Sequence, residues 1–180
     1  MSDLVKIAKT EISNSNKLCV IAGLNVLEDD QLTFEVAERL KKITEAQGNS
    51  FIFKASFDKA NRSSVDSYRG PGLEKGLEIF RELKKSDYQL ITDIHEISQV
   101  EQISEVVDII QIPAFLCRQT DLIKEACQSG KPLNIKKGQF LSPDQMKNII
   151  EKCFNFGNDQ VMLCERGTSF GYDNLVVDML

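Results

Sequence analysis

The 180-residue sequence lacks the patterns that hold structural metals, disulfide frameworks or membrane spans. It has one histidine, no tryptophan and five cysteines, and no two of those cysteines form a C-x-x-C pair. Such an odd, scattered set is typical of reduced thiols and not of a zinc site or a disulfide scaffold. The apolar runs fall far short of the roughly 20 residues that cross a bilayer, and the first residues contain no apolar signal-peptide region. We therefore expect a cytoplasmic protein with reduced cysteines and no membrane segment.

The chain also lacks an excess of positive charge and the glycine motifs of nucleotide-binding proteins. Its 22 lysines and arginines against 27 aspartates and glutamates give a formal net charge of −5, with no basic run. This balance argues against nucleic acid or a membrane surface as a partner. Neither G-x-G-x-x-G nor G-x-x-x-x-G-K-[ST] follows an apolar run. The length and the hydrophobic share of 42% predict a single globular domain over residues 1–180.

Short apolar runs alternate with amphipathic helical patterns along the chain. The predicted strands are residues 18–23, 51–54, 89–93, 108–111, 133–136 and 161–166. Their apolar parts are nearly continuous, as in strands that are buried on both faces of a parallel sheet. The predicted helices begin at about residues 30, 73, 98, 122 and 142, and a sixth is expected to start at Asp173 or Asn174.

Capping signals and the repeated strand–helix order together predict the fold class. Ser98 with Glu101, and Ser142 with Gln145, have the spacing of capping boxes. Repeated strand–helix units predict an α/β protein with a parallel sheet, either doubly wound or closed into a barrel. Six units followed by the apolar segment 175–180 favour a (β/α)8 TIM barrel, of which this chain holds about six units and is apparently incomplete at its C-terminus.

In parallel α/β folds ligands bind at the carboxyl ends of the strands, and here those ends carry charge. The residues at these ends are Lys54, Asp93, His95, Gln111, Lys136, Lys137 and Arg166. Cations at three separate strand ends of an acidic chain predict a mouth that binds a small anion. The alternative is structural ion pairing of the lysines with Asp93 and Glu165. We expect His95 to form hydrogen bonds in the site and not to bind a metal, because no second histidine or well-spaced thiol accompanies it.

Two segments that follow predicted strands carry further groups suited to phosphate. Residues 55–72 form a connection of 18 residues, longer than the usual about 2–6. This segment gathers Lys59, Asn61, Arg62, Ser63, Ser64 and Arg69. Arginine beside hydroxyl groups and backbone amides suits phosphate, and a plain solvated loop is the alternative. In residues 113–121, Phe115 and Arg118 line the mouth or contact another subunit, unless Phe115 belongs to the core.

Several of these segments closely resemble one enzyme family. They are residues 54–64 (KASFDKANRSS), 68–73 (YRGPGL), 92–96 (TDIHE), 111–122 (QIPAFLCRQTDL), 134–140 (NIKKGQF) and 164–180 (CERGTSFGYDNLVVDML). They resemble 3-deoxy-D-manno-octulosonate 8-phosphate synthase, also called 2-dehydro-3-deoxyphosphooctonate aldolase. The resemblance implies a cytoplasmic (β/α)8 barrel, usually a homotetramer. It also implies a transferase that condenses phosphoenolpyruvate with D-arabinose 5-phosphate and water and releases phosphate, on the route to the Kdo sugar of lipopolysaccharide.

The resemblance also assigns roles to residues of this sequence. Phosphoenolpyruvate would be held by Lys54, Lys59, Gln111, Ala114, Lys136 and Arg166. Arabinose 5-phosphate would be held by Ser56, Asn61, Arg62, Ser63, Asp93, Phe115 and Arg118, the last two lent by an adjacent subunit. The catalytic set would be Asn25, Lys59, Lys136 and Asp93. These groups would orient the reactants and stabilise charge while C3 of phosphoenolpyruvate attacks the aldehyde, water adds at C2 and phosphate leaves by C–O cleavage.

Asn25 bears on the metal requirement that the resemblance implies. The metal-dependent branch of the family has a cysteine at this place, and an amide is a poor ligand compared with a thiolate, so we expect no metal and no other cofactor. Ile97 stands where the family commonly has proline, and the sequence ends before the strands seven and eight and the late histidine that the family uses. Two alternatives stay open. They are the related 3-deoxy-7-phosphoheptulonate synthase, which uses erythrose 4-phosphate, and a truncated, non-catalytic chain that binds anions.

Overall fold

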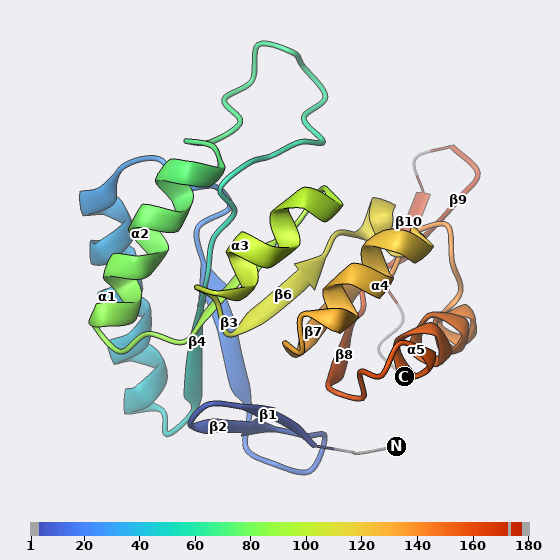
Figure 1. The fold of residues 1–180 in the computed structure, drawn as a ribbon, viewed down its shortest axis with the longest axis horizontal. Coiled ribbons are helices and arrows are strands. Elements are labelled where there is room, and N and C mark those ends of the chain that lie inside the picture. Colours follow the sequence, from blue (N-terminus) through green and yellow to red (C-terminus); the bar gives the residue numbers. More distant parts are fainter. Residues whose placement is uncertain (1–3, 173, 178–180) are drawn as a thin grey trace.

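A curved parallel sheet forms the centre of the molecule. The structure is a computed structural model that describes residues 4–172 and 174–177. The six strands of the sheet are β3 (Cys19–Gly23), β4 (Ser50–Lys54), β5 (Leu90–Asp93), β6 (Ile109–Ile112), β7 (Leu133–Lys136) and β8 (Val161–Cys164). They lie in chain order, each parallel to the next, and curve like part of a barrel wall (Figure 1). All six predicted strands are confirmed, with small shifts at their ends.

Helices connect successive strands and pack on the outer side of the sheet (Figure 1). They are α1 (Asp30–Ala46), α2 (Leu73–Lys85), α3 (Val100–Ser104), α4 (Thr120–Gln128) and α5 (Met146–Asn155), with 3-10 turns η1 (Ile97–Gln99), η2 (Ala114–Leu116) and η3 (Pro143–Gln145). In α2 the residues Leu77, Phe80 and Leu83 recur at helical spacing and are buried against the sheet. The alternation of strand and helix confirms the α/β class and part of a (β/α)8 barrel.

A short hairpin packs on the sheet near the amino ends of its strands (Figure 1). Its strands are β1 (Val5–Ile7) and β2 (Thr10–Ile12). Val5 and Ile7 pack on the inner face of the sheet in a second, smaller apolar cluster. Gln89, which precedes β5, fixes the hairpin because its side chain accepts from Thr10 Oγ1 (2.6 Å) and donates to the Ile7 carbonyl (2.7 Å). This hairpin was not predicted from the sequence, because three-residue strands are too short to show an alternating pattern.

The segment after β8 is a hairpin, so the predicted sixth helix is wrong over the described residues. β9 (Thr168–Phe170) pairs antiparallel with β10 (Asn174–Val176). Asp173, one of the two predicted first residues of the helix, lies outside the described residues. Gly171 supplies the turn with a φ of 63°, and the β-branched Val176 favours an extended backbone.

The start of α3 also differs from the predicted capping box of Ser98 and Glu101. Glu96 is the cap residue of the preceding turn η1: its side chain accepts from the backbone N–H of Gln99, and Gln99 Oε1 accepts from the backbone N–H of Glu96 (3.3 Å). Gln99 Oε1 also accepts from the backbone N–H of His95 (2.8 Å), which fixes the backbone directly after β5. The predicted box of Ser142 and Gln145 is confirmed, one 3-10 turn ahead of α5.

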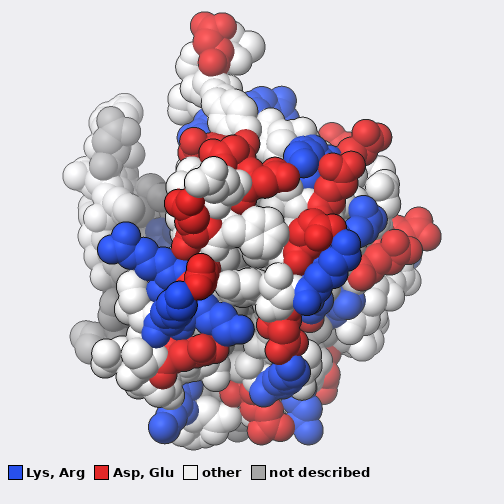
Figure 2. Space-filling view, turned by 90° about the vertical axis from the view of Figure 1, so that its left-hand side faces the viewer, with Lys and Arg blue, Asp and Glu red and all other residues white. Residues whose placement is uncertain are grey.

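Charged side chains of both signs intermingle over the face formed by α1 and α2 (Figure 2). The ion pairs on these helices include Lys42–Glu38, Lys75–Asp30 and Lys85–Glu82, and all six side chains are about half or more exposed. Such mixed charge is typical of a solvated outer surface and contributes little to stability. Among residues 4–172 and 174–177, no helix is long and apolar enough to cross a membrane.

The sheet is open along two edges. Within the described part of the chain, β3 pairs with β4 alone and β8 pairs with β7 alone. In a closed eight-stranded barrel every strand has two neighbours. The inner face between the two open edges is therefore accessible and lines a cavity.

Candidate active site

A cavity of about 490 Å³ opens where the strands end and the loops that follow them begin. Many residues selected from the sequence line it, namely Asn25, Lys59, Asn61, Arg62, Asp93, His95, Gln111, Ala114, Phe115, Lys136 and Arg166. Ala60, Glu96, Pro113 and Leu116 complete the lining. These four residues had no role predicted from the sequence, although each lies next to a residue that did. We call this cavity the mouth.

Cationic side chains from three separate segments line the mouth. Lys59 comes from the loop after β4, Lys136 from the end of β7 and Arg166 from the loop after β8. Burial lowers the pKa of Lys59, and the charges of Lys136, Arg62 and Arg166 lower it further, against the opposing effect of Asp93. The cations thus repel one another, and a bound anion would relieve that repulsion.

Lys54 lies beneath the mouth, at the end of β4, and faces the inner side of the sheet. Its Nζ donates to Ser56 Oγ at 3.4 Å, and the same oxygen accepts from Lys59 Nζ at 2.9 Å. Burial lowers the pKa of Lys54 to about 8, an effect that Asp93 opposes and Lys59 and Lys136 reinforce. Lys54 therefore gives up its proton close to neutral pH, unlike an exposed lysine.

Asp93 and His95 form the polar centre of the mouth. Asp93 Oδ2 lies 3.4 Å from His95 Nε2, and the Asp93 residue is 6% exposed. Burial alone raises the pKa of Asp93, but the hydrogen bonds from His95 and Ser56 and the charges of Lys54 and Lys59 outweigh it and hold the pKa well below its usual range. Asp93 is therefore a carboxylate throughout the physiological range.

The contact between Asp93 and His95 uses one polar atom of each side chain and not the other. Asp93 Oδ1 and His95 Nδ1 are buried and have no hydrogen-bond partner among the described residues. Buried polar atoms without partners are rare in folded proteins. Both residues line the mouth, which places this pair at the site.

The 55–72 segment is tied down at both ends while its tip is exposed. Arg69 pairs with Asp58, with Nε and Oδ1 2.8 Å apart, and its backbone carbonyl accepts from the Lys59 N–H at 2.6 Å. Arg62 Nε donates to the carbonyl of Tyr68 at 3.2 Å. Arg69, which the sequence analysis grouped with the phosphate-binding residues, is thus a brace of the loop. The solvated-loop alternative describes residues 60–66, all of which are exposed, but not the two ends.

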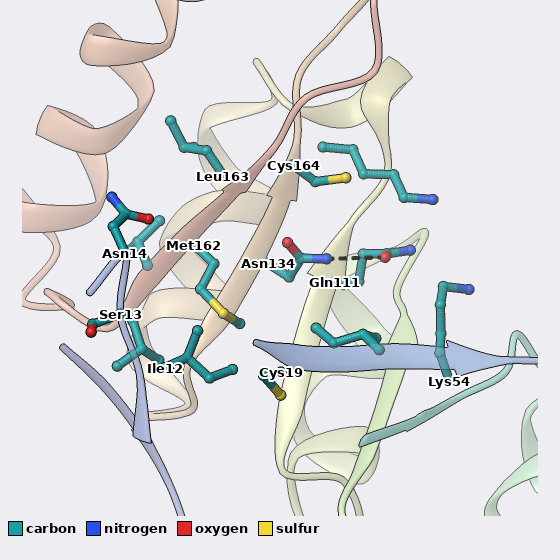
Figure 3. A pocket seen from close by; sticks show the side chains of 14 residues that line it. Ile12, Ser13, Asn14, Cys19, Lys54, Gln111, Asn134, Met162, Leu163 and Cys164 are labelled. Atoms are coloured by element: carbon teal, nitrogen blue, oxygen red, sulfur yellow. Dashed lines mark hydrogen bonds between the residues drawn. The ribbon is translucent and has the colours of Figure 1, made fainter. Parts of the chain in front are cut away.

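A second cavity of about 720 Å³ lies on the inner face of the sheet (Figure 3). Apolar side chains, among them Ile12, Cys19 and Met162, line its lower part. Toward the strand ends Asn134 Nδ2 donates to Gln111 Oε1 at 3.3 Å. Gln111 and Lys136 line both cavities, so the inner cavity meets the mouth at these two residues. Asn134 has no predicted role, yet a polar residue inside a buried strand is a signal that could have singled it out.

Lys137 does not line either cavity, so its predicted place among the anion-binding cations is wrong. Its side chain is 2% exposed and lies 3.5 Å from Glu165, as the alternative of structural ion pairing expected for a lysine at a strand end. Successive side chains of a strand point to opposite faces. Lys136 faces the cavities, and Lys137 therefore points away from them.

The remaining predicted residues lie around the mouth. Ser56 is fully buried below it, and Phe115 is 58% exposed at its rim, so Phe115 is not a core residue. Ser63 and Arg118 are exposed and outside the lining of both cavities. Any contact of Ser63 or Arg118 with a ligand thus requires a ligand that extends beyond the mouth, or a second subunit.

Metal ligands are scarce in the described part of the chain. Residues 4–172 and 174–177 contain no group of three or more His, Cys, Asp and Glu side chains placed to hold a metal ion. Asn25 lines the mouth, where an amide is a weaker ligand than a thiolate. The metal independence inferred from Asn25 stays a prediction.

Comparison with known proteins identifies the family. A sequence model of the DAHP synthetase I family matches residues 4–180. The chain belongs to the DAHP synthetase I family. This DAHP synthetase I chain is 56% identical to the 2-dehydro-3-deoxyphosphooctonate aldolase of Pasteurella multocida (strain Pm70) and 54% identical to that of Haemophilus influenzae (strain PittEE), in each case over 178 residues. The family resemblance predicted from the sequence is confirmed.

The relatives are longer than this DAHP synthetase I chain. Each of these two matches covers 98% of the chain but 63% of the relative. The same protein from Bdellovibrio bacteriovorus (strain HD100) is 54% identical and is covered over 62% of its length. The chain therefore spans less than two thirds of the length of these curated relatives.

Proposed function

We propose that this chain is the substrate-binding part of a 3-deoxy-8-phosphooctulonate synthase, which condenses phosphoenolpyruvate with D-arabinose 5-phosphate and water. One observation carries the proposal: cations from separate strand ends meet in one mouth, beside a carboxylate–imidazole pair with unsatisfied polar atoms. Phosphoenolpyruvate is a small, highly charged anion, and a sugar phosphate combines one anionic end with several hydroxyl groups. The mouth offers both kinds of partner, and the names of the relatives agree with this substrate pair.

Phosphoenolpyruvate is assigned to the cationic side of the mouth. Lys59, Lys136 and Arg166 would hold its carboxylate and phosphate by charge-assisted hydrogen bonds. Gln111 at the end of β6 and Ala114 in the following turn η2 would contact it from the neighbouring wall of the mouth. Lys54, below them, would add charge from the inner face. Fixed cations around the phosphate also stabilise the negative charge that collects on it as the C–O bond breaks.

Arabinose 5-phosphate is assigned to the side of the mouth lined by the 55–72 loop. Arg62 and Ser63 would hold its phosphate and Asn61 would contact the sugar phosphate beside them. Asp93, Ser56 and Asn25 would lie near its reacting end. The unsatisfied Asp93 Oδ1 would accept from a sugar hydroxyl. In this arrangement C3 of phosphoenolpyruvate attacks the aldehyde, water adds at C2 and phosphate leaves.

Assembly, location and extent belong to the same proposal. Phe115 is exposed at the rim and Arg118 is exposed outside the lining of the mouth, in keeping with a role toward the mouth of a neighbouring subunit in a homotetramer. We place the protein in the cytoplasm, in the synthesis of the Kdo sugar of lipopolysaccharide, without a metal or other cofactor. We also assign residues 1–180 to one barrel domain, of which the described residues supply a six-stranded parallel sheet.

Phosphate release is the direct test. Phosphoenolpyruvate is mixed with arabinose 5-phosphate or erythrose 4-phosphate, with and without a chelator, using the 180-residue chain and a chain continued to the length of its relatives. Chelator-resistant phosphate release that occurs with arabinose 5-phosphate, and does not occur with erythrose 4-phosphate, supports the proposal. Release with erythrose 4-phosphate favours 3-deoxy-7-phosphoheptulonate synthase. Binding without release by the longer chain favours a non-catalytic anion-binding protein.

The lowered pKa of Lys54 predicts a pH dependence of phosphoenolpyruvate binding. Lys54 is protonated below a pH of about 8 and neutral above it, so affinity falls as the pH rises through that value. Titration calorimetry between pH 6.5 and 9.5 measures the effect, and the step should vanish in Lys54→Met, which also binds more weakly at low pH. Affinity that is constant through this range, or a step that persists in Lys54→Met, contradicts the assignment.

A further inference from the structure

Lys137 is a buried cation that the proposed reaction does not use. Its side chain is 2% exposed, and its Nζ donates to the carbonyls of Gly167 (2.6 Å), Leu141 (2.9 Å) and Gly138 (3.3 Å) and to Thr168 Oγ1 (3.1 Å). Burying an ammonium group is costly unless it is paired and fully hydrogen-bonded. Here the group is surrounded by acceptors, which fix its position.

These acceptors come from two different loops. Gly138 and Leu141 belong to the loop after β7, while Gly167 and Thr168 belong to the segment after β8. Two further bonds join the same loops: Thr168 Oγ1 contacts the Leu141 carbonyl (3.3 Å), and Ser169 N donates to Gln139 O (2.8 Å). Lys137 Nζ lies where the two loops meet.

Glu165 extends this network to the backbone of Arg166. Its carboxylate lies 3.5 Å from Lys137 Nζ and accepts from the backbone N–H groups of Arg166 (2.8 Å) and Gly167. Lys136 directly precedes Lys137 in the chain. The two mouth cations Lys136 and Arg166 are thus each adjacent in the chain to a member of one ion pair, in which Lys137 is buried and the Glu165 side chain is 26% exposed.

We propose that Lys137 is a positioning residue that holds Lys136 and Arg166 in the geometry that binds phosphoenolpyruvate. Like charges repel, and two cations on flexible side chains would otherwise separate until a ligand arrived. Anchoring the backbone at both sides reduces the reorganisation that binding requires. The assignment of the ligand rests on the proposed function, whereas the arrangement of the cations can be measured without any ligand.

The test compares Lys137→Met with Lys147→Met. Methionine keeps most of the volume of Lys137 and removes its charge, while Lys147 is a 75% exposed side chain of α5 paired with Asp144 and serves as the control. We expect Lys137→Met to weaken phosphoenolpyruvate binding by about tenfold or more, because small misplacements of binding groups have large effects. Affinity for arabinose 5-phosphate should stay within about twofold, since the residues proposed to bind it lie on other loops. A general loss of structure would instead weaken the binding of both ligands.

A ligand-free measurement accompanies the binding experiment. The charges of Lys136 and Arg166 contribute to the lowered pKa of Lys59, so their release in Lys137→Met should raise the Lys59 pKa toward its usual value. NMR titration of labelled lysine side chains measures this shift, and Lys147→Met should show none. If Lys137→Met does not fold, Glu165→Gln is the second variant, because it keeps the acceptor and loses the ion pair. It should change phosphoenolpyruvate affinity and the Lys59 pKa in the same directions.

The outcomes separate the two proposals. A folded variant with an unchanged Lys59 pKa and unchanged phosphoenolpyruvate affinity overturns the role of Lys137, as does a parallel loss of both ligands. A native chain that binds no phosphoenolpyruvate contradicts the proposed function. The Lys59 titration then still decides whether Lys137 positions the cations.

Discussion

Replacement of Lys59 by methionine is expected to reduce phosphoenolpyruvate affinity by about 100-fold, because truncating one partner of a desolvated charge pair costs about 2–5 kcal/mol and each 1.4 kcal/mol is tenfold. The charges of the other mouth cations act on Lys59, and its Nζ is anchored at 2.9 Å to a fully buried hydroxyl, that of Ser56. The ligand therefore meets a charge whose place is set before binding. Titration calorimetry at pH 7 measures the change.

The matched control is Lys85→Met. Lys85 is a 71% exposed lysine of α2 that pairs with Glu82 on the same helix, so its loss should leave affinity unchanged. Circular dichroism of both variants checks that the fold is retained. If Lys59→Met binds within threefold of the native chain, the mouth is not the phosphoenolpyruvate site.

Gly70→Ala is expected to lower the free energy of unfolding by about 3 kcal/mol, the sum of left-handed backbone strain and a steric clash. Gly70 has a φ of 122°, and an added Cβ would lie 2.3 Å from the carbonyl oxygen of Phe57. A backbone atom cannot move aside as a flexible side chain can. Urea denaturation measures the loss. The carbonyl of Arg69, the residue before Gly70, accepts a hydrogen bond from the backbone N–H of Lys59, so phosphoenolpyruvate binding should weaken as well.

Gly130→Ala separates the two components of this effect. Gly130 also has a positive φ, 71°, but an added Cβ would meet nothing within 4 Å. It should therefore lose only about 1 kcal/mol, from backbone strain. Equal destabilisation by the two substitutions would show that the close approach at Phe57 is unimportant.

The strands were predictable from the sequence because each is a nearly continuous apolar run between turn residues, as in β6 (Ile109–Ile112). The N-terminal hairpin was not, because its strands have three residues each. The helix expected from residue 173 onward was suggested by apolar residues whose spacing suits either a helix or a strand. The extended conformation is adopted because the turn at Gly171 brings β10 alongside β9, and this pairing is not visible in the local sequence pattern.

The mouth was predictable because parallel strands end at one edge, so residues far apart in the chain, such as Lys59 and Arg166, had to converge. The position of a residue at a strand end does not reveal where its side chain points. Lys137 was misplaced for this reason, and Lys54 lies in the inner cavity and not in the lining of the mouth. The brace between Arg69 and Asp58 could not be foreseen either, since both residues lie in a loop without a repeating pattern.

The gathering of cations in the mouth also governs the speed of ligand capture. The chain as a whole is acidic, with a net charge of −5, so a dianion approaching the charged face of α1 and α2 meets a mixed field (Figure 2). Near the mouth the field is positive and confined by low-dielectric walls, which raises association rates by about tenfold or more. Such guidance acts over about one Debye length, roughly 8 Å at physiological ionic strength. We therefore expect salt to slow the entry of a small anion far more than its escape.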